Sequence, residues 1–81
     1  MKVRALFYAQ LRDVAATPHL NVDLPEGAAI SDLLAEIYER IPALRAHDKS
    51  ILTGAGVEFV DQNYKLKAGE EIAIMPPVQG G

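Results

Sequence analysis

Alternation of apolar and polar residues predicts two β-strands near the start of the chain. In residues 2–9 (KVRALFYA), Val3, Ala5, Phe7 and Ala9 fall on one face. Residues 19–24 (HLNVDL) alternate in the same way. Because successive side chains of a strand point to opposite faces, each segment has one face suited to a core. A turn at residues 25–27 (PEG) closes the second segment, and we expect the two strands to be antiparallel neighbours.

A different periodicity, with apolar residues three and four apart, predicts helices. Residues 10–16 are expected to form a short helix. A longer helix is predicted over residues 32–41, with Ser31 as its N-cap and Asp32 in its first turn, where a negative charge stabilises the positive end of the helix dipole. Residues 42–50 are expected to be irregular or a single turn. The apolar stripe of the longer helix consists of Leu33, Leu34, Ile37, Tyr38 and Ile41.

The second half of the chain returns to strand patterns. Residues 51–55 and 57–60 flank Gly56 and predict a hairpin, and residues 70–75 predict a last strand. The segment between them is expected to be a loop that ends in a turn at residues 67–69. The stretch Gly54-Ala55-Gly56 lacks the Lys-Ser or Lys-Thr of a phosphate loop and is interpreted as turn chemistry.

The order of elements is strand, strand, helix and three further strands. A single main helix that covers one face of a sheet is a stable two-layer arrangement. The crossover through the helix predicts a parallel partner for the first strand among the later ones. The sequence therefore predicts the α+β class and a β-grasp (ubiquitin-like) fold, a mixed five-stranded sheet with one main helix and short extra helical turns.

Composition and charge restrict the possible functions. The chain has 81 residues, 49% hydrophobic and 23% charged, which is typical of one globular domain. It contains no cysteine, which excludes disulfides, cysteine nucleophiles and cysteine-ligated metals. A net charge of −3 argues against nucleic acid as a partner, and the chain contains no apolar run that could span a membrane. A cytoplasmic location is the expectation, with no membrane partner.

The residues that most often carry chemistry are isolated in this sequence. His19 and His47 have no second ligand at metal-binding spacing, so no metal site is predicted. Ser31 lacks the glycines of a nucleophile elbow. The acidic pairs Glu26–Asp32 and Glu70–Glu71 stand at a turn and at a strand start, where solvated charge is normal. The body of the chain therefore offers no catalytic constellation.

The last six residues, Pro76-Pro77-Val78-Gln79-Gly80-Gly81, are the remaining candidate. We expect a domain over residues 1–75 and a flexible tail over residues 76–81. Each proline favours extended chain, and glycines can pass through a channel only as wide as a backbone. With Gly81 as the last residue, its α-carboxylate is free. Adenylation by ATP would activate that carboxylate toward a sulfur or amine nucleophile, so the tail would supply an acyl group and another protein the catalyst.

At these residues the chain resembles a known family, the ubiquitin-like sulfur carriers, and most closely the MoaD-like small subunits of molybdopterin synthase. The resemblance runs over essentially the whole chain. It is most specific at VRALFYAQLRD (residues 3–13), at AGEEIAIMPP (residues 68–77) and at Gly80-Gly81. Two departures are a hairpin over residues 53–57 without the usual Val-Asn-Gly-like turn, and Gln79 in place of serine or threonine.

The resemblance implies a specific chemistry for the tail. The Gly81 carboxylate would be adenylated by an E1-like (MoeB-like) adenylyltransferase that uses ATP, and would then become a thiocarboxylate. The tail, residues 76–80 (Pro76, Pro77, Val78, Gln79 and Gly80), would insert into a MoaE-like large subunit within a heterotetramer. There the thiocarboxylate would donate sulfur for the dithiolene of the molybdenum cofactor. The chain alone is expected to bind no cofactor.

A tail that inserted alone would bind weakly, because ordering its backbone costs roughly 1–2 kcal/mol per residue. A second, apolar contact on the body is therefore expected. Strand parity places Tyr8 and Met75 on the outer side of the sheet. Phe59 fits either side by parity, and the resemblance implies an interface role for it. We predict that Tyr8, Phe59 and Met75 form a docking patch beside the tail.

Three other functions remain open at the level of sequence. The chain could be a ubiquitin-like modifier joined through Gly81 to lysines of other proteins, which uses the same activated carboxylate. It could be the sulfur carrier of thiamin synthesis, although those carriers are usually shorter and lack the two prolines. It could also be a plain interaction domain whose tail is incidental, in which case removal of the glycines would change nothing.

Overall fold

The computed structural model describes residues 1–77, and the strands and helices predicted in this range are present with small changes in their bounds. The elements are β1 (Lys2–Phe7), α1 (Gln10–Ala15), β2 (His19–Asp23), α2 (Ile30–Arg40), the 3-10 helix η1 (Pro42–Ser50), β3 (Leu52–Ala55), β4 (Glu58–Val60) and β5 (Glu71–Met75). The first strand is two residues shorter than predicted. Ala9 has a positive φ of 51°, which turns the chain out of the strand and into α1.

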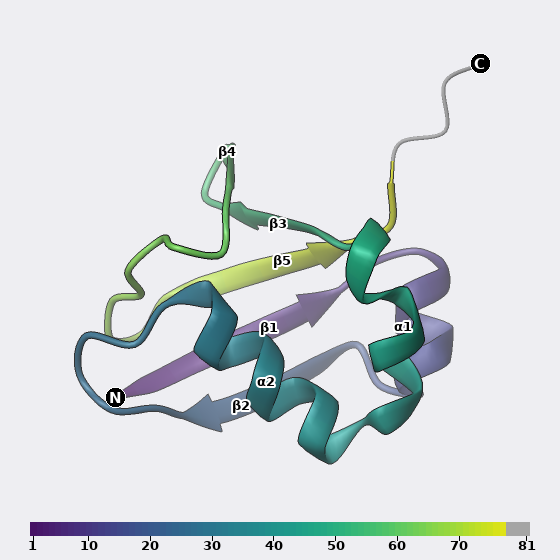
Figure 1. Cartoon of the computed structure of the whole chain (residues 1–81), viewed down its shortest axis with the longest axis horizontal. Coiled ribbons are helices and arrows are strands. Elements are labelled where there is room, and N and C mark those ends of the chain that lie inside the picture. The colour runs from purple at the N-terminus through teal and green to yellow at the C-terminus, as the bar shows by residue number, and fades with distance from the viewer. Residues whose placement is uncertain (78–81) are drawn as a thin grey trace.

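The five strands form one mixed sheet in the order β2-β1-β5-β3-β4 (Figure 1). β1 and β2 are antiparallel neighbours, as their patterns predicted, and β1 pairs with β5 in parallel. β3 pairs with β4 as the predicted hairpin and with β5 on its other side, both antiparallel. The first and last strands of the chain therefore lie side by side in the middle of the sheet, and both run toward the same end of it.

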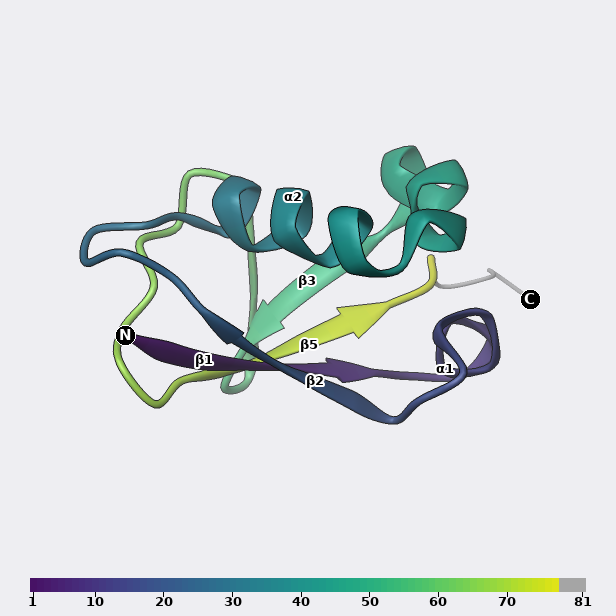
Figure 2. The same ribbon diagram turned by 90° about the horizontal axis from the view of Figure 1, so that it is seen from below.

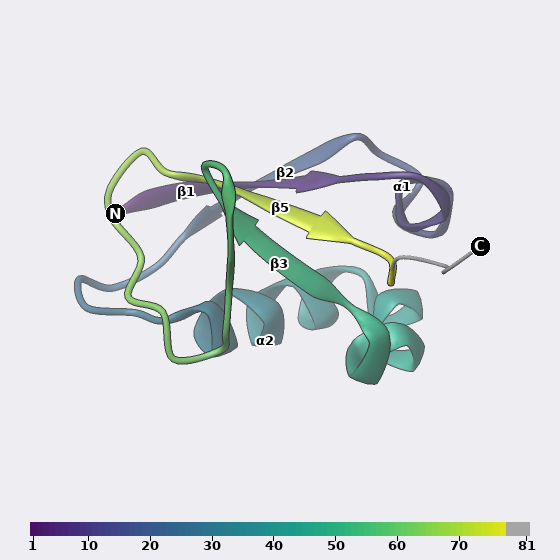
Figure 3. The same cartoon turned by 90° about the horizontal axis from the view of Figure 1, so that it is seen from above.

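One face of the sheet is covered by α2 (Figures 2 and 3). Four residues of the predicted apolar stripe, Leu33, Leu34, Ile37 and Tyr38, are buried and belong to the same core as the inward side chains of the central strands, whereas the fifth, Ile41, is the C-cap and only partly buried. Those inward residues are Val3, Ala5, Phe7, Ile72 and Ile74, each at most 3% exposed. Burial of these side chains from strands and helix together supplies the main favourable term in folding. The outward face of the sheet is thereby left for other contacts.

The 3-10 helix η1 closes the core beside α2. Leu44 is fully buried and is the anchor of this segment. The Tyr38 hydroxyl of α2 donates a hydrogen bond of 2.6 Å to the Asp48 carboxylate of η1. Burial, this hydrogen bond and the Asp48 charge together raise the pKa of Tyr38, and the nearby Arg45 charge opposes them. The tyrosine thus ties η1 to the main helix, and the expectation of an irregular segment or a single turn over residues 42–50 is wrong, because the segment is a 3-10 helix of 9 residues.

The start of α2 corrects one prediction. Ala29 is the N-cap, and Ser31 lies exposed inside the first turn with no capping role for its side chain. The Asp32 carboxylate accepts a hydrogen bond of 2.9 Å from the Ala29 N–H. The helix begins early because the preceding residues pair with a distant loop, through an isolated bridge between Ala29 and Lys65. A contact of such long range leaves no local mark that capping rules can detect.

The hairpin turn is also placed differently from the stretch Gly54-Ala55-Gly56 that was interpreted as turn chemistry. Gly54 and Ala55 belong to β3, and the turn itself consists of Gly56 and Val57 alone. Gly56 has a φ of 63°, a conformation that favours glycine. The interpretation of Gly54 as a turn residue is therefore wrong, and its place inside the sheet needs another reason.

Candidate functional site

The exit of the tail lies at the end of the two parallel central strands. Pro76 is half-buried and Pro77 is exposed directly after β5. Tyr8, the residue after β1, donates its N–H to the Ile74 carbonyl over 3.1 Å, which keeps the ends of β1 and β5 together. The predicted tail residues Val78, Gln79, Gly80 and Gly81 lie outside the described residues, so their roles and the division of the chain at residue 75 stay predictions.

Strand register places an apolar group of residues on the outward face beside this exit. Leu6 of β1 pairs with Ala73 of β5, which pairs with Gly54 of β3, which in turn pairs with Phe59 of β4. Closer to the exit, Met75 pairs with Leu52 on one side. On its other side it lies beside Tyr8, because the preceding residues, Phe7 and Ile74, are paired. We call this group the outer patch; its members are Leu6, Tyr8, Leu52, Phe59, Ala73 and Met75.

The three predicted docking residues all belong to the outer patch, with different surroundings. Tyr8 is 47% exposed and lies next to Met75, as strand parity indicated. Met75 is only partly buried, so its side chain still reaches the surface. Phe59 is 68% exposed on the edge strand β4; register places it on the same face, across β3, and at this edge it also lines a hollow with Leu34 of α2 and Asp48 of η1. Exposed large apolar side chains that cluster in this way are typical of interaction surfaces.

Sequence reasoning missed Leu52 and the small residues between the large ones. Leu52 pairs with Met75, while Ala73 and Gly54 leave a shallow hollow next to Leu6 and Tyr8. Only the pairing of β3 with β5 brings these positions together, because Leu52 and Met75 are far apart in the chain. Parity within each strand was the available signal, but without the register it could not assign neighbours.

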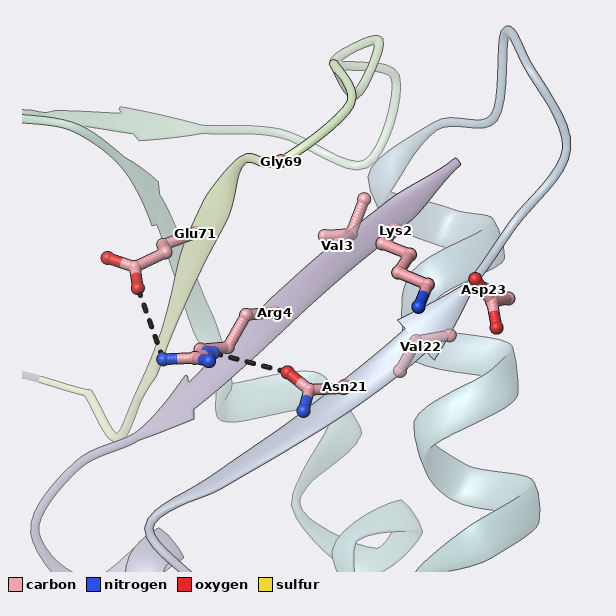
Figure 4. A pocket seen from close by; sticks show the side chains of 8 residues that line it. All are labelled: Lys2, Val3, Arg4, Asn21, Val22, Asp23, Gly69 and Glu71. Atoms are coloured by element: carbon pink, nitrogen blue, oxygen red, sulfur yellow. Dashed lines mark hydrogen bonds and ion pairs between the residues drawn. The ribbon is translucent and has the colours of Figure 1, made fainter.

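The outward face becomes polar toward the opposite end of the same strands, where Arg4 lies between Asn21 and Glu71 in a shallow pocket (Figure 4). The Arg4 guanidinium donates to the Asn21 side-chain oxygen over 3.1 Å and lies 3.7 Å from the Glu71 carboxylate. Both charged side chains are about half exposed, so this ion pair adds little to stability. Its effect is to separate the apolar half of the face, at the tail exit, from a charged half.

The remaining candidate residues do not gather into a site. His19 lies exposed on β2 and His47 lies on η1, on different elements. Glu70 does not simply face solvent, because its carboxylate accepts hydrogen bonds from the Tyr64 hydroxyl and from the Lys67 N–H. The Tyr64 bond raises the pKa of that phenol, and it fixes the turn before β5. Glu70 therefore has a structural role.

The described part of the chain offers neither a metal site nor a membrane span. Among residues 1–77, no group of three or more histidine, cysteine or acidic side chains is arranged to hold a metal ion. Within the same residues, no helix is both long enough and apolar enough to cross a bilayer.

Comparison with known proteins agrees with this architecture. The sequence model of the ThiS family matches residues 5–81. The molybdopterin synthase sulfur carrier subunit of Chlamydomonas reinhardtii is 37% identical, over the full length of both chains.

Two solved structures have the same fold. A putative molybdopterin converting factor, subunit 1, from Pyrococcus furiosus superposes with a TM-score of 0.86 at 27% identity, covering 96% of this chain and 99% of that one. The small archaeal modifier protein 1 from Methanosarcina acetivorans superposes with a TM-score of 0.80 at 28% identity, covering 99% and 96%.

The sheet order, the single covering helix and the exit of the chain from the central strand define a ubiquitin-like β-grasp protein, which confirms the predicted fold class. The chain belongs to the ThiS family. The resemblance to the molybdopterin synthase sulfur carriers is likewise confirmed by a relative that matches from end to end.

Proposed function

We propose that this chain is the sulfur carrier subunit of a molybdopterin synthase. The observation that carries the proposal is the position of the outer patch: exposed and partly exposed apolar residues lie on the outward face of the sheet, and Tyr8 and Met75 among them lie next to the point where Pro76 and Pro77 leave it. A partner that bound this patch would receive the following residues directly into its own interior. The full-length similarity to a sulfur carrier subunit supports the same function.

The proposed chemistry takes place at the Gly81 carboxylate, with Gly81 as the last residue. An E1-like, MoeB-like enzyme joins this carboxylate to the α-phosphate of ATP, and pyrophosphate leaves. Sulfide then displaces AMP from the acyl adenylate, which gives a thiocarboxylate. Its sulfur attacks an electrophilic carbon of the pterin precursor, and an oxygen substituent of that carbon leaves, which forms a thioester. Water then cleaves the thioester at its carbonyl, which leaves the sulfur on the pterin and restores the Gly81 carboxylate. The described residues contribute no catalytic side chain to these steps.

Two sets of contacts divide the work in the proposed complex. The outer patch gives affinity through apolar burial, at about 25 cal/mol per Å² removed from water. Residues 76–80, inserted into a MoaE-like large subunit, give position, because two prolines reduce the conformational freedom that binding removes. Two carriers and two large subunits would form the heterotetramer that the resemblance implies.

Reconstitution with intact-mass measurement tests the proposal. The purified chain is incubated with its E1-like enzyme, ATP and a sulfide source, and a thiocarboxylate adds about 16 mass units, the difference between sulfur and oxygen. A variant that lacks Gly81 is the control, and it is expected to stay unmodified while its unfolding temperature is unchanged. Failure of the full chain to gain this mass, in a mixture that modifies a known carrier, would contradict the proposal.

A second function is favoured by the likeness to the small archaeal modifier protein 1 of Methanosarcina acetivorans. A protein modifier would use the same adenylated carboxylate with a lysine amine in place of sulfur. The products separate the two functions, since a modifier gives isopeptide conjugates of higher mass on other proteins. Digestion of cell extract and a search for lysines that carry the chain's last residues measures this directly.

A further inference from the structure

Gly54 occupies a position in which glycine is not required by the backbone. It lies in the middle of β3, paired with Ala73 on one side and Phe59 on the other. The described glycines with positive φ are Gly27, Gly56 and Gly69, and Gly54 is not among them. A glycine inside a strand weakens it, because it packs no side chain and loses more entropy on folding. The reason for a glycine at this position therefore has to be sought in the side chains that pack against it.

The space over Gly54 is filled by the end of the Met75 side chain. A Cβ atom built on Gly54 would lie 3.1 Å from the Met75 Cε, which is closer than carbon atoms normally approach. The next neighbours, the Glu58 carbonyl oxygen at 3.5 Å and the Ala73 Cβ at 3.7 Å, are at ordinary contact distance. A methyl group at this position would therefore displace one thing, the tip of Met75.

This contact determines how Met75 is presented. Met75 pairs in register with Leu52, yet its methyl group lies over Gly54, the position paired with Ala73. A methionine side chain has three rotatable bonds and adapts to many surroundings, so a single conformation needs a seat. Gly54 provides that seat, and it also lines a hollow on the same face, together with Leu6, Tyr8 and Ala73 and with the acidic Glu70 and Glu71.

We propose that Gly54 is a positioning residue for docking of the large synthase subunit: it holds the Met75 side chain flat on the outer patch, next to the exit of the tail. This inference rests on the proposed function, and it assigns the shape of the docking surface in part to a residue that has no side chain of its own. A methyl group at Gly54 would act mainly by shifting the Met75 methyl, its nearest neighbour, and would also fill a little of the hollow that Gly54 lines.

The substitution Gly54→Ala tests this inference, since alanine adds one methyl group and its backbone preferences permit the strand conformation. The variant is expected to unfold at the same temperature as wild type or slightly higher, because alanine has less entropy to lose than glycine. Its affinity for the large subunit, measured by calorimetry, is expected to fall at least about fivefold, or roughly 1 kcal/mol. The affinity for the large subunit would thus fall while the unfolding temperature stays the same or rises slightly.

Two further measurements separate a positioning role from a general structural one. The chain contains two methionines, Met1 and Met75, so the Met75 methyl signal is readily assigned by NMR. Wild type should show a nuclear Overhauser effect between this methyl and the Gly54 α-protons, and Gly54→Ala should shift the methyl signal. In a Met75→Ala background, Gly54→Ala should change affinity by less than about twofold, since coupled positions are not additive.

The outcomes distinguish this inference from the proposed function. If Met75→Ala by itself leaves affinity unchanged, docking at the outer patch is wrong and the proposed function loses its support. If Met75→Ala weakens binding but Gly54→Ala does not, only the positioning role is overturned. The absence of the Overhauser effect in wild type would overturn it as well, even if the Gly54 variant failed to fold.

Discussion

Met75 is the last strand residue before the two prolines, and its side chain has one part packed on the sheet and one part at the surface. Leu52 and Gly54 hold it on the sheet, while its remaining surface faces outward beside Tyr8. Such a residue can serve the folded domain and a partner at once. This explains why its side chain is partly buried, where strand parity alone indicated a fully outward position.

The substitution Met75→Asp is expected to weaken docking at least about a hundredfold, because an unpaired carboxylate buried at an interface costs several kcal/mol. The isolated domain should remain folded with a loss of about 1 kcal/mol, since the contacts with Gly54 and Leu52 are lost. Val57→Asp is the matched control: Val57 is fully exposed in the hairpin turn, and an added charge there should leave both quantities nearly unchanged. Equal binding by the Met75 variant and wild type would place the docking surface elsewhere.

At the scale of the element, the start of α2 shows how a distant contact changes a helix. The loop that contains Lys65 pairs with Ala29, and the Tyr64 carbonyl accepts from the Ile30 N–H over 3.0 Å. These bonds satisfy donors that a capping side chain would otherwise serve. The Asp32 carboxylate completes the arrangement from inside the first turn.

This arrangement predicts opposite results for two adjacent substitutions. Asp32→Ala should lower the free energy of unfolding by about 1 kcal/mol, because it removes the bond to the Ala29 N–H and a favourable charge at the helix start. Ser31→Ala should change it by less than about 0.5 kcal/mol, as for other surface sites without a special role. Urea denaturation of both variants measures the difference. A larger loss for the Ser31 variant would restore serine as the cap.

The bond between α2 and η1 predicts a dependence on alkaline pH. The pKa of Tyr38 is higher in the folded chain than in the unfolded one, so folding favours the neutral phenol. Its contribution is complete below the unfolded pKa, about 10, and is lost as the pH rises above that value. Tyr38→Phe should therefore cost about 1 kcal/mol at pH 7, through the lost hydrogen bond to Asp48.

Comparison of the two proteins over a range of pH measures this effect. Between about pH 9 and pH 11 the stability of wild type should fall faster than that of Tyr38→Phe, so the difference between them narrows. Taking the difference removes the titration of lysines, which both proteins share. A constant difference up to about pH 11 would show that the hydrogen bond does not discriminate between the two forms of the phenol.

At the scale of the whole molecule, the sheet separates two tasks between its faces. The inward face packs against α2 and forms the core, and the outward face presents an apolar half beside the tail exit and a charged half around Arg4. The buried core residues of the described chain all come before Met75, most of them in strands and helices and a few, such as Leu24 and Leu66, in the connecting segments. Stability thus depends mainly on the inward residues, and the proposed function on the outer patch and the tail, with Met75 contributing to both.

Removal of residues 78–81 tests this separation. The free energy of unfolding should change by no more than about 0.5 kcal/mol, because the described sheet, helices and core all lie within residues 1–77. Sulfur transfer should be abolished, whereas weak docking through the outer patch should persist. Calorimetry with the large subunit measures the docking that remains. A variant that unfolds would show that the last residues contribute to the domain itself.

The sequence by itself determined the elements and their buried faces, and the physical reason is that both are local. A period of two or of 3.6 residues indicates strand or helix and the side that turns inward, as for Ile72 and Ile74 in β5 or Leu33 and Ile37 in α2. The ending Pro-Pro-Val-Gln-Gly-Gly likewise indicated chemistry at the tail, and the isolated polar residues indicated no catalytic site in the body. The hypothesis about the tail concerns mainly residues 78–81, which lie beyond the described range.

Only the tertiary structure decided the register between strands, and with it which residue of one strand lies beside which residue of the next. Leu52 meets Met75, and Gly54 lies beneath the Met75 methyl, because β3 and β5 pair in one register, which the patterns of the two strands do not fix individually. The early start of α2 has the same origin, in the contact of Ala29 with Lys65. Contacts between residues far apart in the chain depend on how all elements pack at once, and that information lies in no single stretch of sequence.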